Sequence, residues 1–389
     1  MRQFICIFSA FALLIGCVKI DPTTTTGQES EAVIAFESPI VAPKVKSVTE
    51  FKSYPDDLNF RVWGFYSEDV YPVISNETIL NPYIVGAEFT KNGNVWSPAG
   101  ERNYYWLKNL YLHFFAYAPA NPKVTEAFRA TVNNVGLRLD KYTVPNTADE
   151  DLLVSDVAYA CTKPLVEGAG IQLQFHHALS SVVFKVNSSI YGDRNDEDEN
   201  RIDTDLRVTK IEIMQARKRG VFRQQLKLEN QQQMGEPSVR KGWYVHDDAP
   251  RQNYVGYKSV EGAVLTDEFI FCHDKQLTAG DEDNVYLTNL MLLPQEIKDY
   301  VLLQVTYDMT HSNMPVDDTT GERIWIKDQI KTVQLNQCGV TEWLRGTRYC
   351  YNISLGLNKI QCSAEVSDWS TTDITTDVED LDVEDVVEL

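Results

Sequence analysis

The chain has 389 residues, with 36 Lys and Arg against 56 Asp and Glu, which gives a formal net charge of −20 at pH 7. A surface this acidic repels phosphate backbones, so the composition excludes nucleic acid as an expected partner. The seven cysteines show no C-x-x-C spacing, and we expect neither a metal site nor a cofactor.

The N-terminus has the pattern of a bacterial lipoprotein signal peptide. Arg2 precedes an apolar run at residues 4–15, which is too short to cross a bilayer. The run ends at Gly16 and Cys17, in a sequence that resembles a lipobox. We therefore expect signal cleavage between Gly16 and Cys17, and palmitate on Cys17 as the membrane attachment. The alternative is an ordinary signal peptide with an incidental cysteine.

The rest of the chain is predicted to be almost wholly β. Its 19 tyrosines and 16 phenylalanines suit half-buried strands. Apolar residues alternate along residues 182–186, 301–309, 349–357 and 360–366, whereas residues 111–118 are largely apolar on both faces. Many short strands separated by polar turns indicate antiparallel β-sandwiches, and long amphipathic helices are not predicted.

A polar, highly charged stretch at residues 192–200 cannot contribute to a hydrophobic core, so we place a domain boundary just before it. We predict an all-β protein with two tandem antiparallel β-sandwich domains. The predicted divisions are a lipoprotein signal peptide at 1–16, a tether at 17–29, an N-terminal β-sandwich at 30–188, a C-terminal β-sandwich at 189–370 and an acidic tail at 371–389.

Candidate chemical sites are few. His176 and His177 are adjacent in a predicted strand and point to opposite faces, so they cannot bind one ion, and a position at the edge of the core is favoured. Residues 193–200 resemble a calcium loop, but Asp198 stands where the EF-hand needs glycine. A solvated loop is favoured there, with weak calcium binding as the alternative. Nucleophile-elbow, zinc-protease and P-loop motifs are missing, so we expect no catalytic residues and no enzyme.

Five cysteines remain after Cys6 leaves with the signal peptide and Cys17 takes lipid. An odd number cannot all pair within one chain, and we interpret them as small buried residues in strands. These five are Cys161, Cys272, Cys338, Cys350 and Cys362.

The tryptophans could stack on sugars if they lined an exposed groove, or they could pack in the core. Most lie within strand-like runs, so core packing is favoured for the majority. The seven are Trp63, Trp96, Trp106, Trp243, Trp325, Trp343 and Trp369.

Four landmarks then follow one another along nearly the whole mature chain. They are the lipobox at Cys17 with the short apolar strand 32–36, Trp106-Leu107 leading into residues 112–119, the strand pattern at 173–186, and residues 348–355 followed by 365–369. Their order and spacing resemble the fimbrillin family, the subunits and accessory proteins of type V pili of Bacteroides-like bacteria.

The resemblance implies two transthyretin-like β-sandwich domains and a structural role. Subunits of that family travel as lipoproteins to the outer membrane, where a trypsin-like protease removes the leading segment with its first strand. The open groove then accepts a strand from another subunit. We therefore expect a structural and adhesive component of type V fimbriae, lipid-anchored and surface-exposed at the cell outer membrane, with other fimbrial subunits as partners. The alternative is a surface glycan-binding lipoprotein.

One departure from the family concerns cleavage. Stalk subunits commonly carry arginine after the first strand, but here no arginine occurs between Arg2 and Arg61, and Arg61 lies in a strand-like run. Lys46 is the candidate maturation site, with Lys44 and Lys52 as the other basic positions. The roles of stalk subunit, uncut anchor and tip adhesin are therefore all open.

The acidic tail is a candidate donor strand. Residues 371–389 hold eight carboxylates and no Lys or Arg, which is also typical of a solvated extension. Apolar residues alternate with polar ones up to Val378 and again from Leu381. The three-residue interval between Val378 and Leu381 moves the second set to the other face of a regular strand. Insertion as a strand would therefore need a bulge or the use of one half alone.

Overall fold

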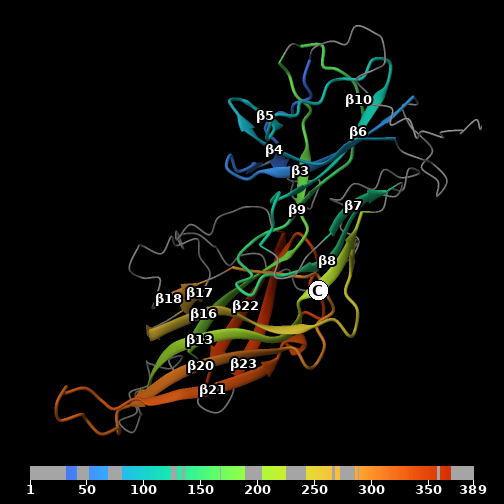
Figure 1. The fold of residues 1–389 in the computed structure, drawn as a ribbon. Coiled ribbons are helices and arrows are strands. Elements are labelled where there is room, and N and C mark those ends of the chain that lie inside the picture. Colours follow the sequence, from blue (N-terminus) through green and yellow to red (C-terminus); the bar gives the residue numbers. More distant parts are fainter. Residues whose placement is uncertain are drawn as a thin grey trace, which may run out of the picture.

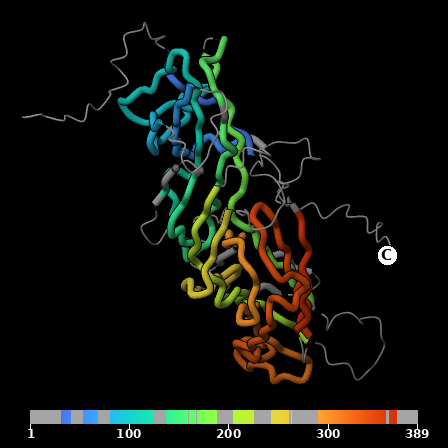
Figure 2. The backbone as a smooth tube through the Cα atoms, turned by 90° about the vertical axis from the view of Figure 1, so that its right-hand side faces the viewer, coloured from blue at the N-terminus to red at the C-terminus, as the bar shows by residue number. Residues whose placement is uncertain are grey.

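The computed structural model describes residues 32–41, 52–68, 81–123, 129–133, 136–166, 168–188, 204–224, 242–264, 268–271, 285–287, 289–356 and 360–368. Within these ranges the chain forms strands and one short 3-10 helix, η2 (Leu335–Gln337), so the predicted all-β class is confirmed. The strands lie in four sheets along an elongated molecule, with the N-terminal strands at one end and β20 to β23 at the other (Figure 1, Figure 2).

The largest sheet lies at the N-terminal end, in the order β2-β1-β11-β9-β6-β3-β4-β5, with β10 beside β6. Its strands are β1 (Ile40–Val41), β2 (Lys52–Ser53), β3 (Phe60–Ser67), β4 (Asn81–Asn92), β5 (Val95–Pro98), β6 (Tyr111–Ala118), β9 (Leu153–Ser155), β10 (Ala158–Cys161) and β11 (Gln174–His177).

Three further sheets complete the described part of the chain, in the orders β17-β12-β22-β23 with β19 beside β12, β18-β16-β13-β20-β21, and β15-β14-β8-β7. Their strands are β7 (Arg129–Asn133), β8 (Gly136–Thr143), β12 (Ser180–Ser188), β13 (Thr204–Arg217), β14 (Arg219–Arg223), β15 (Trp243–Tyr244), β16 (Arg251–Val264), β17 (Glu268–Phe271), β18 (Val285–Leu287), β19 (Leu290–Leu292), β20 (Leu302–His311), β21 (Ile326–Gln334), β22 (Thr347–Leu355) and β23 (Ile360–Asp368).

The strands predicted from alternation are present. β20 covers the predicted segment 301–309, and β22 pairs with β23 as the predicted terminal hairpin. The pairing differs from a purely antiparallel arrangement in two places, because β1 runs parallel to β11 and β12 runs parallel to β22. Parallel neighbours need a long connection, and the chain between β12 and β22 supplies one.

β12 pairs with strands on the other side of the predicted domain boundary. Although it precedes the predicted boundary at 188–189, it hydrogen-bonds to β17, β19 and β22, all of which follow that boundary. Likewise, β8, which precedes the boundary, pairs with β14, which follows it. Two sheets therefore combine strands from both sides of the boundary. Alternation shows that Val182, Phe184 and Val186 are buried, but it cannot show which sheet the strand joins.

Two hydrophobic clusters lie on the two faces of the sheet around β3 and β6. Phe114 belongs to the smaller cluster, at the N-terminal end, and its neighbour Phe115 belongs to the larger one. Val62 and Trp63 divide in the same way between the two clusters. A strand with a core on each face has no solvent side, which explains why residues 111–118 are largely apolar on both faces and why even the polar His113 is buried.

Core packing is confirmed for five tryptophans, since each is at most 6% exposed. These are Trp63, Trp96, Trp106, Trp243 and Trp343. Trp325 is half-buried, and the guanidinium of Arg207 lies 4.0 Å from its ring centroid. Trp369 lies outside the described residues. No described tryptophan therefore presents an open, fully exposed ring to a sugar.

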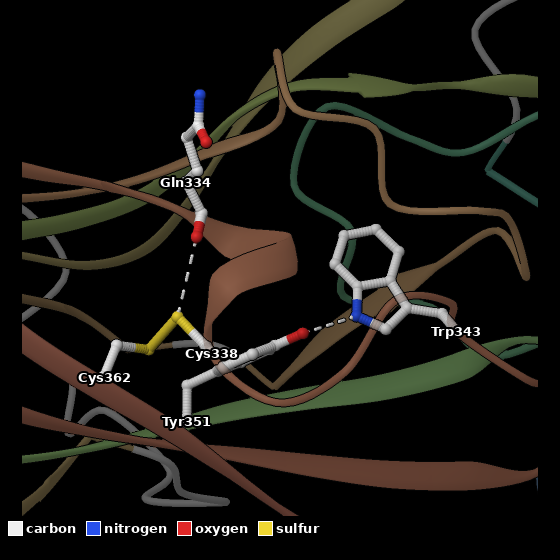
Figure 3. The surroundings of a disulfide bond; sticks show 5 residues. All are labelled: Gln334, Cys338, Trp343, Tyr351 and Cys362. Atoms are coloured by element: carbon white, nitrogen blue, oxygen red, sulfur yellow. Dashed lines mark hydrogen bonds between the residues drawn. A yellow bond between two sulfur atoms is a disulfide. The ribbon is translucent and has the colours of Figure 1, made fainter.

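Two cysteines differ from their interpretation as small buried residues in strands, because Cys338 and Cys362 form a disulfide (Figure 3). The bond joins the turn after η2 to β23, across 24 positions of sequence. Nearby, the indole N–H of Trp343 donates to the Tyr351 hydroxyl at 2.9 Å. Spacing along the chain could not reveal this pair, because the strands bring it together. Cys161 and Cys350 are half-buried in strands, and Cys272 lies outside the described residues.

The first prediction tests both clusters. Trp106→Ala in the smaller cluster and Phe115→Ala in the larger should each lower the free energy of unfolding by roughly 3–5 kcal/mol, because each removes a buried ring and leaves a cavity. Val85, which is 70% exposed, is the matched control, and Val85→Ala should change stability by less than about 0.5 kcal/mol. Thermal melting is the measurement. Wild-type melting of both core variants, with loss of sugar binding, would favour the glycan-binding alternative instead.

Candidate functional site

Residues 32–41, here called the bridging segment, are hydrogen-bonded on both sides. On the first side, the N–H of Ile34 donates to the carbonyl of Tyr104 at 2.7 Å. Phe36 and Trp96 then exchange two backbone hydrogen bonds, at 2.9 and 2.8 Å. This side of the bridging segment is antiparallel to the chain that it meets.

The second side of the bridging segment pairs with the chain that leads into β11. The N–H of Glu37 donates to the carbonyl of Ile171 at 3.0 Å, and the N–H of Ile171 donates to Ala35 at 3.0 Å. Further along, the N–H of Ile40 donates to the carbonyl of Leu173 at 3.1 Å. Here the two chains run parallel.

These contacts join two distant ends of the largest sheet. Trp96 is in β5, which is the last strand at one end, whereas Ile171 leads into β11 near the other end. The bridging segment fills the space between them, in the part of the fold where Figure 1 shows β3, β4, β5 and β6. Without it, the backbone groups of β5 and of residues 171–173 that now bind it would lose those partners.

Four side chains of the bridging segment are buried: Ile34, Phe36, Pro39 and Val41. Phe36 is the largest, and it lies edge-on to three rings of the smaller cluster. The distances between ring centroids are 5.8, 5.0 and 5.3 Å to Phe60, Phe89 and Phe114, respectively. Edge-to-face pairs of this kind stabilise by about 0.5–1.5 kcal/mol each beyond their buried area.

The rings around Phe36, here called its pocket, continue into further aromatic side chains of the smaller cluster. Tyr54 contacts Trp96 and Phe175 with centroid distances of 5.4 and 5.2 Å. Burial raises the pKa of Tyr54 well above its ordinary value, so its side chain is neutral. An aromatic pocket beside strand edges that need a partner can bind an extended apolar peptide, with register set by alternating side chains.

Gly170 makes the close approach of the bridging segment possible. A Cβ atom at this position would lie 2.5 Å from the backbone N of Glu37 and 2.5 Å from the carbonyl carbon of Phe36. Contacts that short with backbone atoms cannot be relieved by rotating a side chain. Sequence reasoning missed this residue, because its only signal is a glycine near an edge whose partner was not known.

The candidate cleavage residue Lys46 follows the bridging segment in the sequence. β1 pairs antiparallel with β2, where Val41 lies opposite Lys52. The intervening residues 42–51 lie outside the described residues, and they include Lys44 and the candidate cleavage residue Lys46. A break there would leave the bridging segment held by non-covalent contacts alone.

Arg61 is engaged within the sheet, in agreement with its predicted position in a strand. Its side chain donates to the carbonyls of Ala120 and Gly86 at 2.8 and 2.9 Å, and it lies 3.8 Å from Glu88. A residue held in a sheet by these contacts is a poor protease substrate, because a protease needs an exposed chain that can leave its partners and enter the active site.

The two histidines of β11 lie on opposite faces, as predicted. His176 contacts Asp156 at 3.0 Å, whereas His177 contacts Asp151 at 2.6 Å. Each histidine therefore has its own carboxylate. Among the described residues, no group of three or more His, Cys, Asp and Glu side chains is placed to hold a metal ion. Nor does that part of the chain contain a helix long and apolar enough to cross a membrane.

The remaining predicted site residues lie outside the described residues. These are Gly16 and Cys17 at the predicted signal cleavage, Lys46, the loop at 193–200 and the acidic tail at 371–389.

Comparison with known proteins gives a family match and several similar structures. The family model described as fimbrillin-like matches residues 69–369, a range that begins after the bridging segment. None of the curated proteins compared with the sequence matches it significantly.

Among solved structures, a fimbrial protein of Bacteroides vulgatus is 15% identical, with a TM-score of 0.55 over 86% of this chain and 100% of that one. At such low identity, this match shows a shared fold. A candidate cell adhesion protein of Bacteroides uniformis is 11% identical, with a TM-score of 0.44 over 88% of this chain and 100% of that one. Another, of Bacteroides ovatus, is 14% identical, with a TM-score of 0.43 over 87% and 98%.

The second prediction tests the contact at Gly170. Gly170→Ala should lower the free energy of unfolding of the intact chain by roughly 1–3 kcal/mol, because the added methyl group presses on the bridging segment. The same substitution should have little effect in a chain that begins at Ser47 and lacks that segment. Thermal melting of both forms measures the difference.

Gly220→Ala is the control, because a Cβ there would meet Trp243 at 3.1 Å and Val245 at 3.3 Å, in the larger cluster and away from the bridging segment. It should affect both forms equally. If Gly170→Ala also destabilises both forms equally, Gly170 is not tied to the bridging segment.

Proposed function

Because the chain belongs to the fimbrillin-like family, we propose that it is a structural and adhesive component of type V fimbriae. In this proposal the subunits assemble by β-strand donation, and the precursor is exported as an outer-membrane lipoprotein. Its partners are other fimbrial subunits, and its role is structural rather than catalytic. A cell-surface position follows from the family, and the fold shared with a Bacteroides fimbrial protein agrees with it.

The observation that carries the proposal is the pairing of the bridging segment on both sides. It is a short peptide between two sheet edges, with Phe36 in an aromatic pocket. Removing such a peptide exposes edges that a strand of another molecule can complete. The backbone hydrogen bonds would then be regained between subunits.

Two features support export. The lipobox at Cys17 directly follows a signal-like apolar run. The Cys338–Cys362 disulfide suits an oxidising compartment outside the cytosol.

The third prediction concerns maturation. Brief trypsin treatment of the lipidated precursor should release a fragment that starts at Ser47, because Lys46 lies in the connector between β1 and β2. N-terminal sequencing identifies the cut, and Lys46→Gln is the control that should abolish this start. A chain that resists cleavage would favour the anchor role. A fragment that starts elsewhere would show that Lys46 is not the maturation site.

The fourth prediction concerns the membrane anchor. Cells grown with labelled palmitate should label the wild-type protein but not the Cys17→Ser variant, since that thiol is the proposed acceptor. Cys161→Ser is the matched control and should keep the label. Wild-type protein that remains unlabelled would contradict lipid attachment.

A further inference from the structure

The loop between β10 and β11 carries two exposed apolar side chains that are adjacent in the sequence. Leu165 is 104% exposed and Val166 is 70% exposed, and they are here called the tip pair. The N–H of Ala169 donates to the carbonyl of Val166 at 3.2 Å, so the chain turns back directly after the pair. Single exposed apolar residues are common, but two adjacent ones on one loop form an apolar surface that a partner can cover.

The tip pair lies at the free end of the molecule, the end opposite to β20 and β21. β10 runs antiparallel to β6, and Cys161 at its end lies opposite Leu112, near the start of β6. The chain then returns through β11 to β12 and the other sheets. Figures 1 and 2 both show the green loop after β10 at this end of the elongated molecule.

The bridging segment begins at the same end. It runs parallel to residues 171–175, with Phe36 beside Ile171 and Ile40 beside Gln174. In a parallel pair both chains enter from the same side. Ala32, which precedes the paired stretch on one chain, therefore lies toward the free end, as does the tip pair, which precedes it on the other.

The distance along the sequence from Cys17 to Ala32 is short. The two are 15 positions apart, and a fully extended chain of that length spans on the order of 50 Å at most. A lipid on Cys17 would therefore hold the free end, and the tip pair with it, close to a membrane. The opposite end of the molecule is not tied in this way.

Charge does not oppose contact between the free end and lipid. The full chain carries a net charge of −20, which disfavours approach to an anionic membrane surface. The described segments at the free end, residues 32–37, 67–68, 101–111 and 162–166, instead hold equal numbers of basic and acidic side chains. The basic ones are Arg102, Lys108 and Lys163, and the acidic ones are Glu37, Glu68 and Glu101.

We propose that the tip pair inserts into the lipid surface to which Cys17 is tethered, so that the molecule stands end-on, with β20 and β21 directed away from the membrane. This inference rests on the lipid attachment in the proposed function and adds a second, non-covalent membrane contact. The partner is a phospholipid bilayer, whose interface takes up apolar side chains. A tether alone fixes only distance, whereas a tether and an inserted loop together fix direction.

End-on attachment leaves the candidate cleavage connector within reach of a protease. Val41 and Lys52, which flank residues 42–51, lie opposite each other in the pair β1 and β2. This pair follows the bridging segment at the end that points away from Ala32. The connector can therefore be cut while the tip pair stays in the lipid.

The test uses the full chain with its lipid, reconstituted into phosphatidylcholine vesicles that contain brominated phosphatidylcholine. Val166→Trp places an indole in the tip pair, and bromine in the bilayer quenches an indole that enters it. The variant should lose fluorescence compared with the same vesicles without bromine. Wild type supplies the background from the seven native tryptophans and should change little.

Two further variants separate insertion from proximity. Val316→Trp places the indole at a position that is 55% exposed, in the loop between β20 and β21, and bromine should not quench it. Leu165→Asp combined with Val166→Trp keeps the tether but puts a carboxylate beside the indole, and the inserted population should fall roughly tenfold or more. Because Leu165 is fully exposed, this change should leave thermal melting unaltered.

The outcomes separate the inference from the proposed function. A palmitate-labelled Val166→Trp chain that bromine does not quench would overturn the inference and leave the lipid anchor in place, whereas wild-type protein without palmitate would overturn both. Equal quenching with and without Leu165→Asp would show that the tether alone brings the loop to the lipid, which contradicts insertion. An emission shift of Val166→Trp that grows with protein concentration without vesicles would identify a second copy as the partner, and it also overturns the inference.

Discussion

Backbone pairing along both sides of residues 32–41 is the constraint on which the N-terminal end of the molecule depends. This short peptide satisfies hydrogen-bonding groups of β5 and of residues 171–173 at once, and it adds Phe36 to the smaller hydrophobic cluster. An edge strand left without a partner invites pairing with other molecules. The same edges would therefore be a stability problem in a monomer that left them uncovered, and in our proposal they join subunits.

The groove requires a close backbone approach and a large pocket at the same place. Gly170 allows the chain to come near Phe36, and three phenylalanine rings define the space that Phe36 fills. Any strand that replaces residues 32–41 must satisfy both conditions. Strength comes from the backbone ladder, whereas register comes from the unusual spacing of the buried side chains.

Local pattern predicted much of this fold. The period-two segments that became β12, β20, β22 and β23 were identified from alternation, and the apolar run of β6 indicated a strand buried on both faces. Partners of strands were not predictable, because alternation fixes which face is buried but not which edge is paired. For that reason the placement of β12 with β22 and the Cys338–Cys362 disulfide emerged only from the structure. The role of Gly170 was not predictable for the same reason, because it depends on Phe36 lying next to it in the folded chain. The proposed lipid and cleavage residues, Cys17 and Lys46, rest on sequence.

The central claim is that residues 32–41 occupy a site that another strand can fill. Amide hydrogen exchange tests it most directly, at the N–H groups of Trp96, Trp106 and Ile171, which donate to the bridging segment. These amides should be protected in the intact chain, exchange much faster once the segment is removed, and regain protection in the assembled oligomer. Equal protection in all three states would contradict the account, because the segment would then not be what covers these edges.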